Sequence, residues 1–299
     1  MRVRSIGGAA LALLLVALPG LAFAQGGGGD TNEEVKKAVE RAVGSSISSS
    51  VAESLSRSIV SEGVSGMATT TLFASPFYNR TDGDFSFGSF KSDTGGIVAG
   101  ALFKLHDIVL LHGALSGAGT STKVSALGTS TSIDATFFEA RLGTDLIFLN
   151  TVPVKGWLTL EGGFSNFNTN VTDDIWSWRA GPSATLSARA GPILIEPSVG
   201  FAFANTFEDD DADTITSFQA GFSLKYRGEK FRPQLNFVYA KVIGPSSIKD
   251  DGFISVGPEI LYAVTPSFLI GGAYSYGTSL NSGVDINSHT VTLEFRWIF

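Results

Sequence analysis

The sequence predicts an all-β protein: a transmembrane antiparallel up-and-down β-barrel of about 12 strands, preceded by an amphipathic α-helix. Three observations predict it: an N-terminal secretory signal, a low content of charged residues (16%) together with 35 glycines, and alternating apolar and polar residues past Gly66. After the signal, no apolar run reaches the roughly 18 residues that a membrane helix needs. Because backbone groups in lipid must be paired internally, such a chain can span a membrane only as a closed barrel.

The N-terminus has the pattern of a secretory signal peptide. Arg2 and Arg4 precede an apolar stretch over residues 6–21, which ends in the small-residue site Ala22-Phe23-Ala24. We expect residues 1–24 to be cleaved after Ala24 and residues 25–32 to form a Gly-rich linker. Cleavage would take the 21 basic residues to 19 against 28 acidic ones, a formal charge of −9, which argues against nucleic acid as a partner. The chain has no cysteine, which excludes disulfides, Cys-ligated metal and a lipoprotein anchor.

Residues 33–62 predict an amphipathic helix that precedes the barrel. The segment has no proline, and an apolar residue recurs every four positions: Val35, Val39, Val43, Ile47, Val51, Leu55 and Ile59. A strict four-residue repeat drifts around a helix of 3.6 residues per turn, so the apolar stripe spirals. With serines filling most other positions, the helix suits the polar lumen of a barrel. A surface or periplasmic position stays open as the alternative.

The barrel is expected over residues 66–299. Its twelve strands are predicted at 67–78, 95–104, 107–118, 132–149, 156–167, 174–188, 192–205, 214–226, 230–243, 253–263, 267–278 and 288–299. Tight connections alternate with long polar ones at 79–94, 119–131, 168–173, 206–213, 244–252 and 279–287. Outer-membrane barrels place short turns in the periplasm and longer loops outside. The sequence therefore predicts a protein of the bacterial outer membrane with both chain ends in the periplasm.

Clean alternation assigns side chains to the two faces of the wall. In the last strand, one face is predicted to meet lipid through Val291, Leu293, Phe295, Trp297 and Phe299. The opposite parity predicts a lumen lined by Glu139, Arg141, Asp145, Glu161, Arg179, Arg189, Glu196, Lys225, Arg227, Arg232, Glu259, Glu294 and Arg296. Seven of these are basic and six acidic, which favours cross-strand ion pairs that narrow the pore. A salt-bridged scaffold and a path for a substrate both remain open.

The architecture resembles a known family. A helix that leads directly into a twelve-stranded barrel, and the terminal strand Val291-Thr-Leu-Glu-Phe-Arg-Trp-Ile-Phe299, resemble autotransporter-type translocator barrels. In that family the barrel and its threaded helix anchor an N-terminal passenger and take part in its export. No passenger lies between Gln25 and Glu33, so the resemblance implies a translocator-like narrow or helix-plugged pore, or a surface anchor. We expect three partners: outer-membrane lipid, lipopolysaccharide, and the barrel assembly machinery, which reads the terminal strand during insertion.

The sequence gives little support for catalysis or for a cofactor. The three histidines are His106, His112 and His289. His112 and Ser116 share a strand face, but four strand residues separate them by about 13 Å, too far for a Ser-His pair. Asp209, Asp210, Asp211 and Asp213 are a weak metal candidate whose spacing matches no defined calcium loop, and a solvated loop tip is the favoured interpretation. We expect a non-catalytic protein without a cofactor, and the alternative function is a passive porin-like channel for small hydrophilic solutes.

Overall fold

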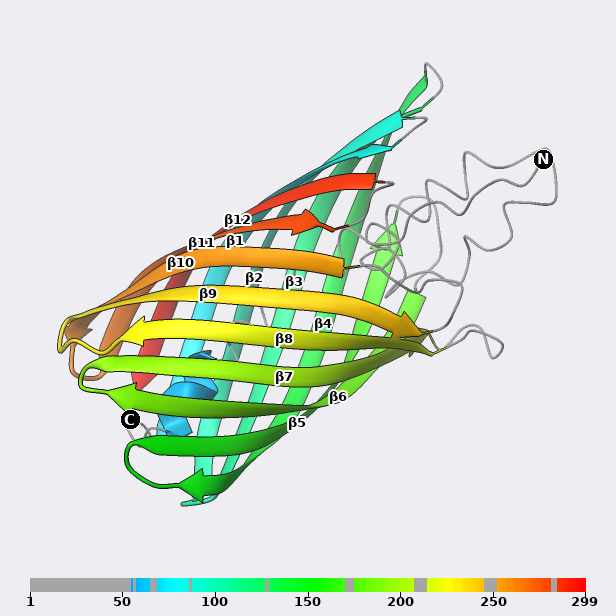
Figure 1. Cartoon of the computed structure of the whole chain (residues 1–299). Coiled ribbons are helices and arrows are strands. Elements are labelled where there is room, and N and C mark those ends of the chain that lie inside the picture. Colours follow the sequence, from blue (N-terminus) through cyan, green and yellow to red (C-terminus); the bar gives the residue numbers. More distant parts are fainter. Residues whose placement is uncertain are drawn as a thin grey trace.

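The computed structural model describes residues 55, 58–64, 69–85, 88–126, 129–169, 175–206, 214–244, 252–280 and 284–299 of the chain. Within them, twelve antiparallel strands form one closed barrel, in which sequence neighbours pair and β12 closes onto β1 (Figure 1). The strands are β1 (Thr70–Phe85), β2 (Gly88–His106), β3 (Val109–Ala126), β4 (Thr129–Asn150), β5 (Val154–Thr169), β6 (Ile175–Ala190), β7 (Ile193–Thr206), β8 (Ile215–Tyr226), β9 (Phe231–Gly244), β10 (Gly252–Thr265), β11 (Phe268–Ser279) and β12 (Val284–Ile298). The predicted fold class and strand number are confirmed.

The β1–β2 and β3–β4 hairpins are longer than predicted. The expected loops 79–94 and 119–131 are wrong: β1 runs on to Phe85 and pairs with β2 down to Gly88, and β3 and β4 pair out to Ala126 and Thr129. Alternation continues through these segments, with buried Asn79 and Thr81 on the inward face. Their polar composition suggested loops, but a strand needs only paired backbone groups and a consistent facing, and threonine favours strands. For the same reason β12 begins at Val284, inside the expected loop 279–287.

The two ends of the barrel differ. Short connections at 107–108, 151–153, 191–192, 227–230 and 266–267 lie at the end that also holds the C-terminus and residues 58–64 (Figure 1). One of them contains Gly191 with a φ of 61°, a left-handed conformation that glycine adopts without strain. The barrel closes at this end as the N–H groups of Thr69 and Thr70 donate to the carbonyl of Phe299. The predicted long loop 206–213 lies, apart from Thr206, outside the described residues.

The outward face of the wall is apolar. On β12, Val291, Leu293 and Trp297 are each at least 40% exposed, whereas Glu294 and Arg296 between them are buried. Trp176 on β6 is likewise exposed. No helix among the described residues is long and apolar enough to cross a membrane. Large exposed apolar side chains around a buried polar interior are the arrangement of a barrel that faces lipid.

Candidate functional site in the barrel lumen

A short helix lies inside the barrel at the end with the short turns. Residues 58–64 form this lumen helix, and every one of them is buried. Its apolar residues Ile59, Val60 and Val64, with the helical residue Leu55 before it, belong to the buried apolar cluster of the interior. A Cβ at Gly63 would lie 2.8 Å from Cδ2 of Leu102 on β2, so glycine lets the helix approach this wall closely. The helix thus rests its apolar side on the wall of β1 to β3.

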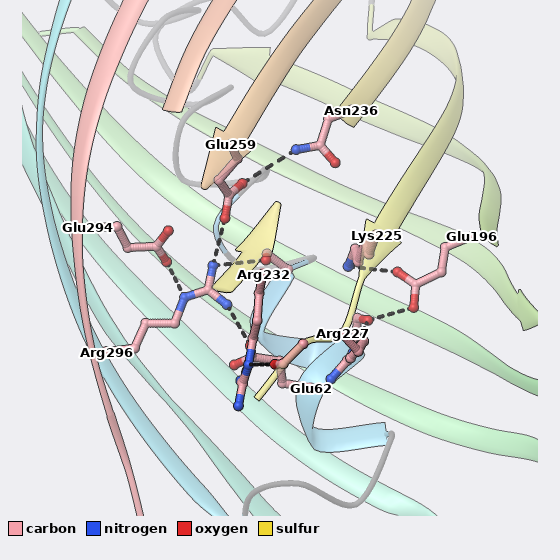
Figure 2. Close-up of polar contacts among 12 residues, drawn as sticks. Glu62, Glu196, Lys225, Arg227, Arg232, Asn236, Glu259, Glu294 and Arg296 are labelled. Carbon is pink, nitrogen blue, oxygen red and sulfur yellow. Dashed lines mark hydrogen bonds and ion pairs between the residues drawn. The ribbon is translucent and has the colours of Figure 1, made fainter. Parts of the chain in front are cut away.

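The other side of the lumen helix is polar and faces charged residues of β7 and β12. Ser58 Oγ accepts a hydrogen bond from Nη2 of Arg296 at 2.9 Å. Ser61 Oγ donates to Oε1 of Glu196 at 2.6 Å. Glu62 Oε1 lies 3.1 Å from Nη1 of Arg296 (Figure 2). The two sides of the helix therefore match the wall around it: its apolar side packs on apolar wall residues, and its polar side binds charged ones.

Arg296 of β12 is the centre of the charged wall. Its side chain is fully buried and is surrounded by three carboxylates, those of Glu62, Glu259 and Glu294 (Figure 2). Glu259 lies 3.1 Å from Nη2, and Glu294 accepts a hydrogen bond from Nε. A buried guanidinium requires such partners, because removing an ion from water costs several kcal/mol that only good ion pairs repay. The helix supplies one of the three carboxylates, through Glu62.

A second set of contacts extends this cluster toward β7, β8 and β9. Lys225 Nζ lies 2.7 Å from Oε2 of Glu196, the carboxylate that also binds Ser61. Arg232 Nη1 lies 3.8 Å from Oε1 of Glu62. A cavity of about 20 Å³, room for about one water molecule, lies between the helix and these strands. It is lined by Ser58, Glu62, Lys225, Tyr226, Arg227, Arg232, Pro233, Gln234 and Leu261. We call the group of Glu62, Glu196, Lys225, Arg232, Glu259, Glu294 and Arg296 the helix-binding cluster.

Arg227 lies beside this cluster, in the connection between β8 and β9. Its Nη2 is 3.4 Å from Oγ of Ser61 on the lumen helix. Burial lowers the pKa of the Arg227 guanidinium below its ordinary value, and the nearby cations Arg232 and Arg296 act in the same direction. The carboxylates of Glu62 and Glu196 oppose this shift, which keeps the group a cation next to the helix.

A second buried cluster lies on β3, β4 and β5, and none of its described contacts reaches the helix. His112 Nδ1 lies 2.8 Å from Oδ2 of Asp145, and its Nε2 lies 3.3 Å from Oε2 of Glu161. Arg141 pairs with Glu139 at 2.7 Å and with Glu161 at 3.0 Å. We call these five residues the wall cluster. A Cβ at position 143 would lie 2.3 Å from Nε2 of His112, so Gly143 makes room for the imidazole.

The structure places most of the predicted lumen residues in one of these clusters. Arg179 of β6 faces inward and is half-buried, outside both clusters. The prediction that Arg189 lines the lumen is wrong. Its side chain is exposed at the end of β6, where the strand leaves the lumen, and it donates a hydrogen bond to the carbonyl of Gly191. Arg227 follows the end of β8, outside the predicted strand 214–226, and its side chain reaches the lumen helix as the predicted inward position requires. The acidic residues Asp209, Asp210, Asp211 and Asp213 lie outside the described residues.

Sequence reasoning missed two members of the site. His112 was considered only as a partner of Ser116, whereas both of its ring nitrogens face carboxylates. Alternation in the sequence places His112 on the inward face. Its partners, however, come from β4 and β5, and which residues meet across strands depends on the register of the strands. Glu62 was missed because it ends the predicted helix, and nothing in the sequence indicated that this end faces Arg296. No Ser-His pair exists here: Ser116 Oγ is buried and has no hydrogen-bond partner among the described residues.

The lumen, expected to be polar, has an apolar wall on one side. Inward-facing apolar side chains of β1 to β5 are buried: Phe73, Phe77, Phe90, Val98, Leu102, Leu110, Ile133, Ile147 and Trp157. Two of the rings cover glycines of the neighbouring strand: a Cβ at Gly100 would lie 2.6 Å from the Phe73 ring, and one at Gly96 would lie 2.7 Å from the Phe77 ring. The surface beneath the helix is therefore itself a packed apolar layer.

Solved structures with this fold are barrels of bacterial outer membranes. The translocator domain of the autotransporter NalP from Neisseria meningitidis matches with a TM-score of 0.51 at 10% identity, over 84% of this chain and 98% of that one. The transport unit of the autotransporter AIDA-I from Escherichia coli matches with a TM-score of 0.51 at 11% identity, over 77% and 90%. An outer membrane channel from Pseudomonas putida F1 matches with a TM-score of 0.54 at 11% identity, over 78% and 96%.

The chain has the fold of an outer-membrane barrel. The resemblance to translocator barrels that the sequence indicated is thus confirmed in fold, and channel barrels share that fold at similar identity. No protein-family model and no curated protein sequence matches the chain.

Proposed function

We propose that this protein is a translocator-like outer-membrane barrel whose lumen is plugged by the helical segment that precedes the first strand, and that it is not an enzyme. One observation carries the proposal. Residues 58–64 are buried in the lumen, with Ser58, Ser61 and Glu62 bound to the charged wall and Ile59 and Val64 in the apolar cluster. A helix is about 10 Å in diameter with its side chains and fills most of a lumen of this strand number.

The apolar repeat of residues 33–54 supports a longer plug. These residues lie outside the described part of the chain, but they continue the four-residue spacing of Leu55 and Ile59. Inward-facing apolar residues at the far end of the lumen, Phe90, Val124, Ile133, Ile215, Val242 and Ile286, are buried and offer such a stripe a complementary surface. The barrel would then act as a narrow pore or a surface anchor, inserted by the assembly machinery through its terminal strand of Val291 to Phe299.

A passive channel for small hydrophilic solutes is the second candidate, and the lining of the outer half of the lumen favours it. Hydroxyl groups bind one another across neighbouring strands there: Ser92 with Thr122, Thr94 with Thr120, Ser165 with Ser177, and Ser255 with Ser275. Paired hydroxyl groups of this kind suit water and small polar solutes. In this case the lumen helix would be a narrow constriction and not a plug.

Single-channel conductance in a planar bilayer distinguishes the two candidates. The intact protein should conduct little, and deletion of residues 25–64 should raise its conductance severalfold. Deletion of residues 25–54 alone is the matched control: it keeps the helix and its contacts, so conductance should stay closer to that of the intact chain. An intact protein that already conducts like a general porin contradicts the plug and favours the channel.

A covalent link tests the same point without shortening the chain. The protein has no cysteine, so Gly63→Cys with Leu102→Cys introduces the only thiols, at two positions in close approach. Joining them by a disulfide or a short bis-thiol linker should abolish spontaneous large openings, and reduction should restore them. Large openings that persist in the linked protein would show that the conducting path does not require the helix to leave.

A further inference from the structure

The outer surface of the barrel carries an unusual pair of lysines. Lys91 of β2 lies directly opposite Lys123 of β3 in the ladder, and both side chains are exposed. They lie toward the end of the barrel opposite the short connections, which we call the long-hairpin end. On their strands they lie beyond the last large outward-facing apolar residues, Ile97 and Leu115. Like charges directly opposite one another on neighbouring strands repel and destabilise a sheet. A site of this kind needs either full hydration or an anion that lies between the two ammonium groups.

Four acidic residues lie near the two lysines on the outward face, Asp82, Asp84, Asp93 and Asp134, and no ion pair joins any of them to Lys91 or Lys123. Asp82 is the ladder partner of Lys91 on β1, but its carboxylate lies 3.4 Å from Nε of Arg80. Asp93 accepts a hydrogen bond from the hydroxyl of Tyr78. Neither Lys91 nor Lys123 makes a hydrogen bond or an ion pair with any residue that the structure describes.

We propose that Lys91 and Lys123 form a binding site for a phosphate group of lipopolysaccharide in the outer leaflet. Opposed Cβ atoms of an antiparallel pair lie about 5 Å apart, so both ammonium groups can reach the oxygens of one phosphate. The anion turns their repulsion into two charge-assisted contacts. The Arg80 guanidinium, also exposed, borders the site on β1.

The position along the wall fits a lipid headgroup. Tyr78 is half-exposed on the outward face, where tyrosines mark the boundary between the hydrocarbon and the headgroups. Arg80 follows it by two residues, about 7 Å further along the strand. The lysine pair lies one ladder step beyond, at the level of Asp82. This inference does not depend on the plug, and it requires only that the long hairpins face the outside, as in other barrels of this membrane.

Native mass spectrometry of the full-length protein in detergent tests the site, with bis-phosphorylated lipid A as the probe. The variant with Lys91→Gln and Lys123→Gln should bind lipid A about tenfold more weakly than the wild-type protein. The matched control carries Lys104→Gln and Lys230→Gln, which remove the same charge at the short-turn end, and it should bind like the wild type. Dephosphorylated lipid A should bind the wild type as weakly as phosphorylated lipid A binds the lysine variant.

A stability measurement separates loss of binding from loss of folding. Without lipid, the lysine variant should resist thermal unfolding at least as well as the wild type, because the repulsion is gone. Added lipid A should raise the unfolding temperature of the wild type and of the control variant, and leave that of the lysine variant unchanged. The proposal would be overturned if the lysine variant and the control variant bound lipid A equally well, or lost its binding equally. Tight binding of dephosphorylated lipid A would also overturn it. So would phosphatidylglycerol that competes as well as lipid A, since that result would indicate a general phospholipid surface.

Discussion

The two buried clusters of the lumen use the same kinds of side chain for different purposes. In the wall cluster, His112, Asp145, Glu161, Arg141 and Glu139 all come from strands β3 to β5, and their described contacts stay within that wall. In the helix-binding cluster, Arg296, Arg232 and Glu196 also hold Glu62 and Ser61 of the lumen helix. The ion pairs of the first cluster join strands of one wall, whereas those of the second also join the wall to the lumen helix.

This difference assigns separate roles to the two clusters. Ion pairs that stay within a wall fix the register and shape of the barrel. Ion pairs that reach a separate segment also set the free energy of keeping that segment docked. Removal of Glu62 with the helix would leave Glu259 and Glu294 as the remaining acidic partners of Arg296, and would take the nearest carboxylate from Arg232. The charged wall is therefore balanced for the plugged state, and mutations should separate barrel stability from plugging.

The largest effect is expected from Arg296→Met. The change leaves Glu62, Glu259 and Glu294 buried around an apolar side chain, and removing one partner of a buried ion pair costs about 3–5 kcal/mol. Urea unfolding of the barrel in detergent should shift to clearly lower urea, and the heat-modifiable band on gels should weaken. Arg80→Met, at an exposed position, should leave both unchanged. Adding Glu294→Gln to Arg296→Met should restore part of the loss, and unaltered unfolding of the single variant would contradict this account.

An intermediate effect is expected from Arg141→Met in the wall cluster. Glu139 is buried and loses its cation, but Glu161 is 19% exposed and keeps His112, so we expect a loss of roughly 1.5–3 kcal/mol. Because the ion pairs of Arg141 with Glu139 and Glu161 lie within the wall of β4 and β5, single-channel conductance should match that of the wild type. A variant that unfolds earlier and also conducts more would show that the two clusters are coupled through the wall.

The sequence predicted the barrel well because alternation is a local property. The facing of Val291 to Phe299 and of Trp176 follows from a period of two, and each hairpin of an up-and-down barrel joins strands that are neighbours in sequence. The strand ends of β1 to β4 were misplaced because polarity was taken as a sign of loops. Residues such as Asn79 and Thr81 are polar because they face the lumen and not because the strand has ended.

The site was less predictable because it depends on contacts between distant segments. The parity of Glu259, Glu294 and Arg296 placed them on the inward face, but their convergence on one guanidinium depends on how β10, β12 and the lumen helix are positioned. The apolar wall under the helix was missed for a related reason. Phe73 and Phe77 face inward next to the outward-facing Leu72 and Tyr78, and with large side chains on both faces the sequence does not alternate clearly there.

The smallest effect on the barrel, and the sharpest test of the comparison, is expected from Glu62→Gln. The amide keeps the shape of the side chain and removes its charge, while Arg296 retains Glu259 and Glu294. Barrel unfolding in urea should therefore stay close to that of the wild type, because no strand residue changes. Docking of the helix should weaken by about 1 kcal/mol, which raises the population of open channels about fivefold. Recordings long enough to count rare large openings measure the ratio of open to closed channels directly.

The matched control is Glu229→Gln, which changes an exposed carboxylate in the β8 to β9 connection and should leave the ratio of open to closed channels unchanged. If the Glu62→Gln barrel unfolds early and opens no more often, Glu62 stabilises the wall and does not hold the plug, and the two clusters then serve the same purpose.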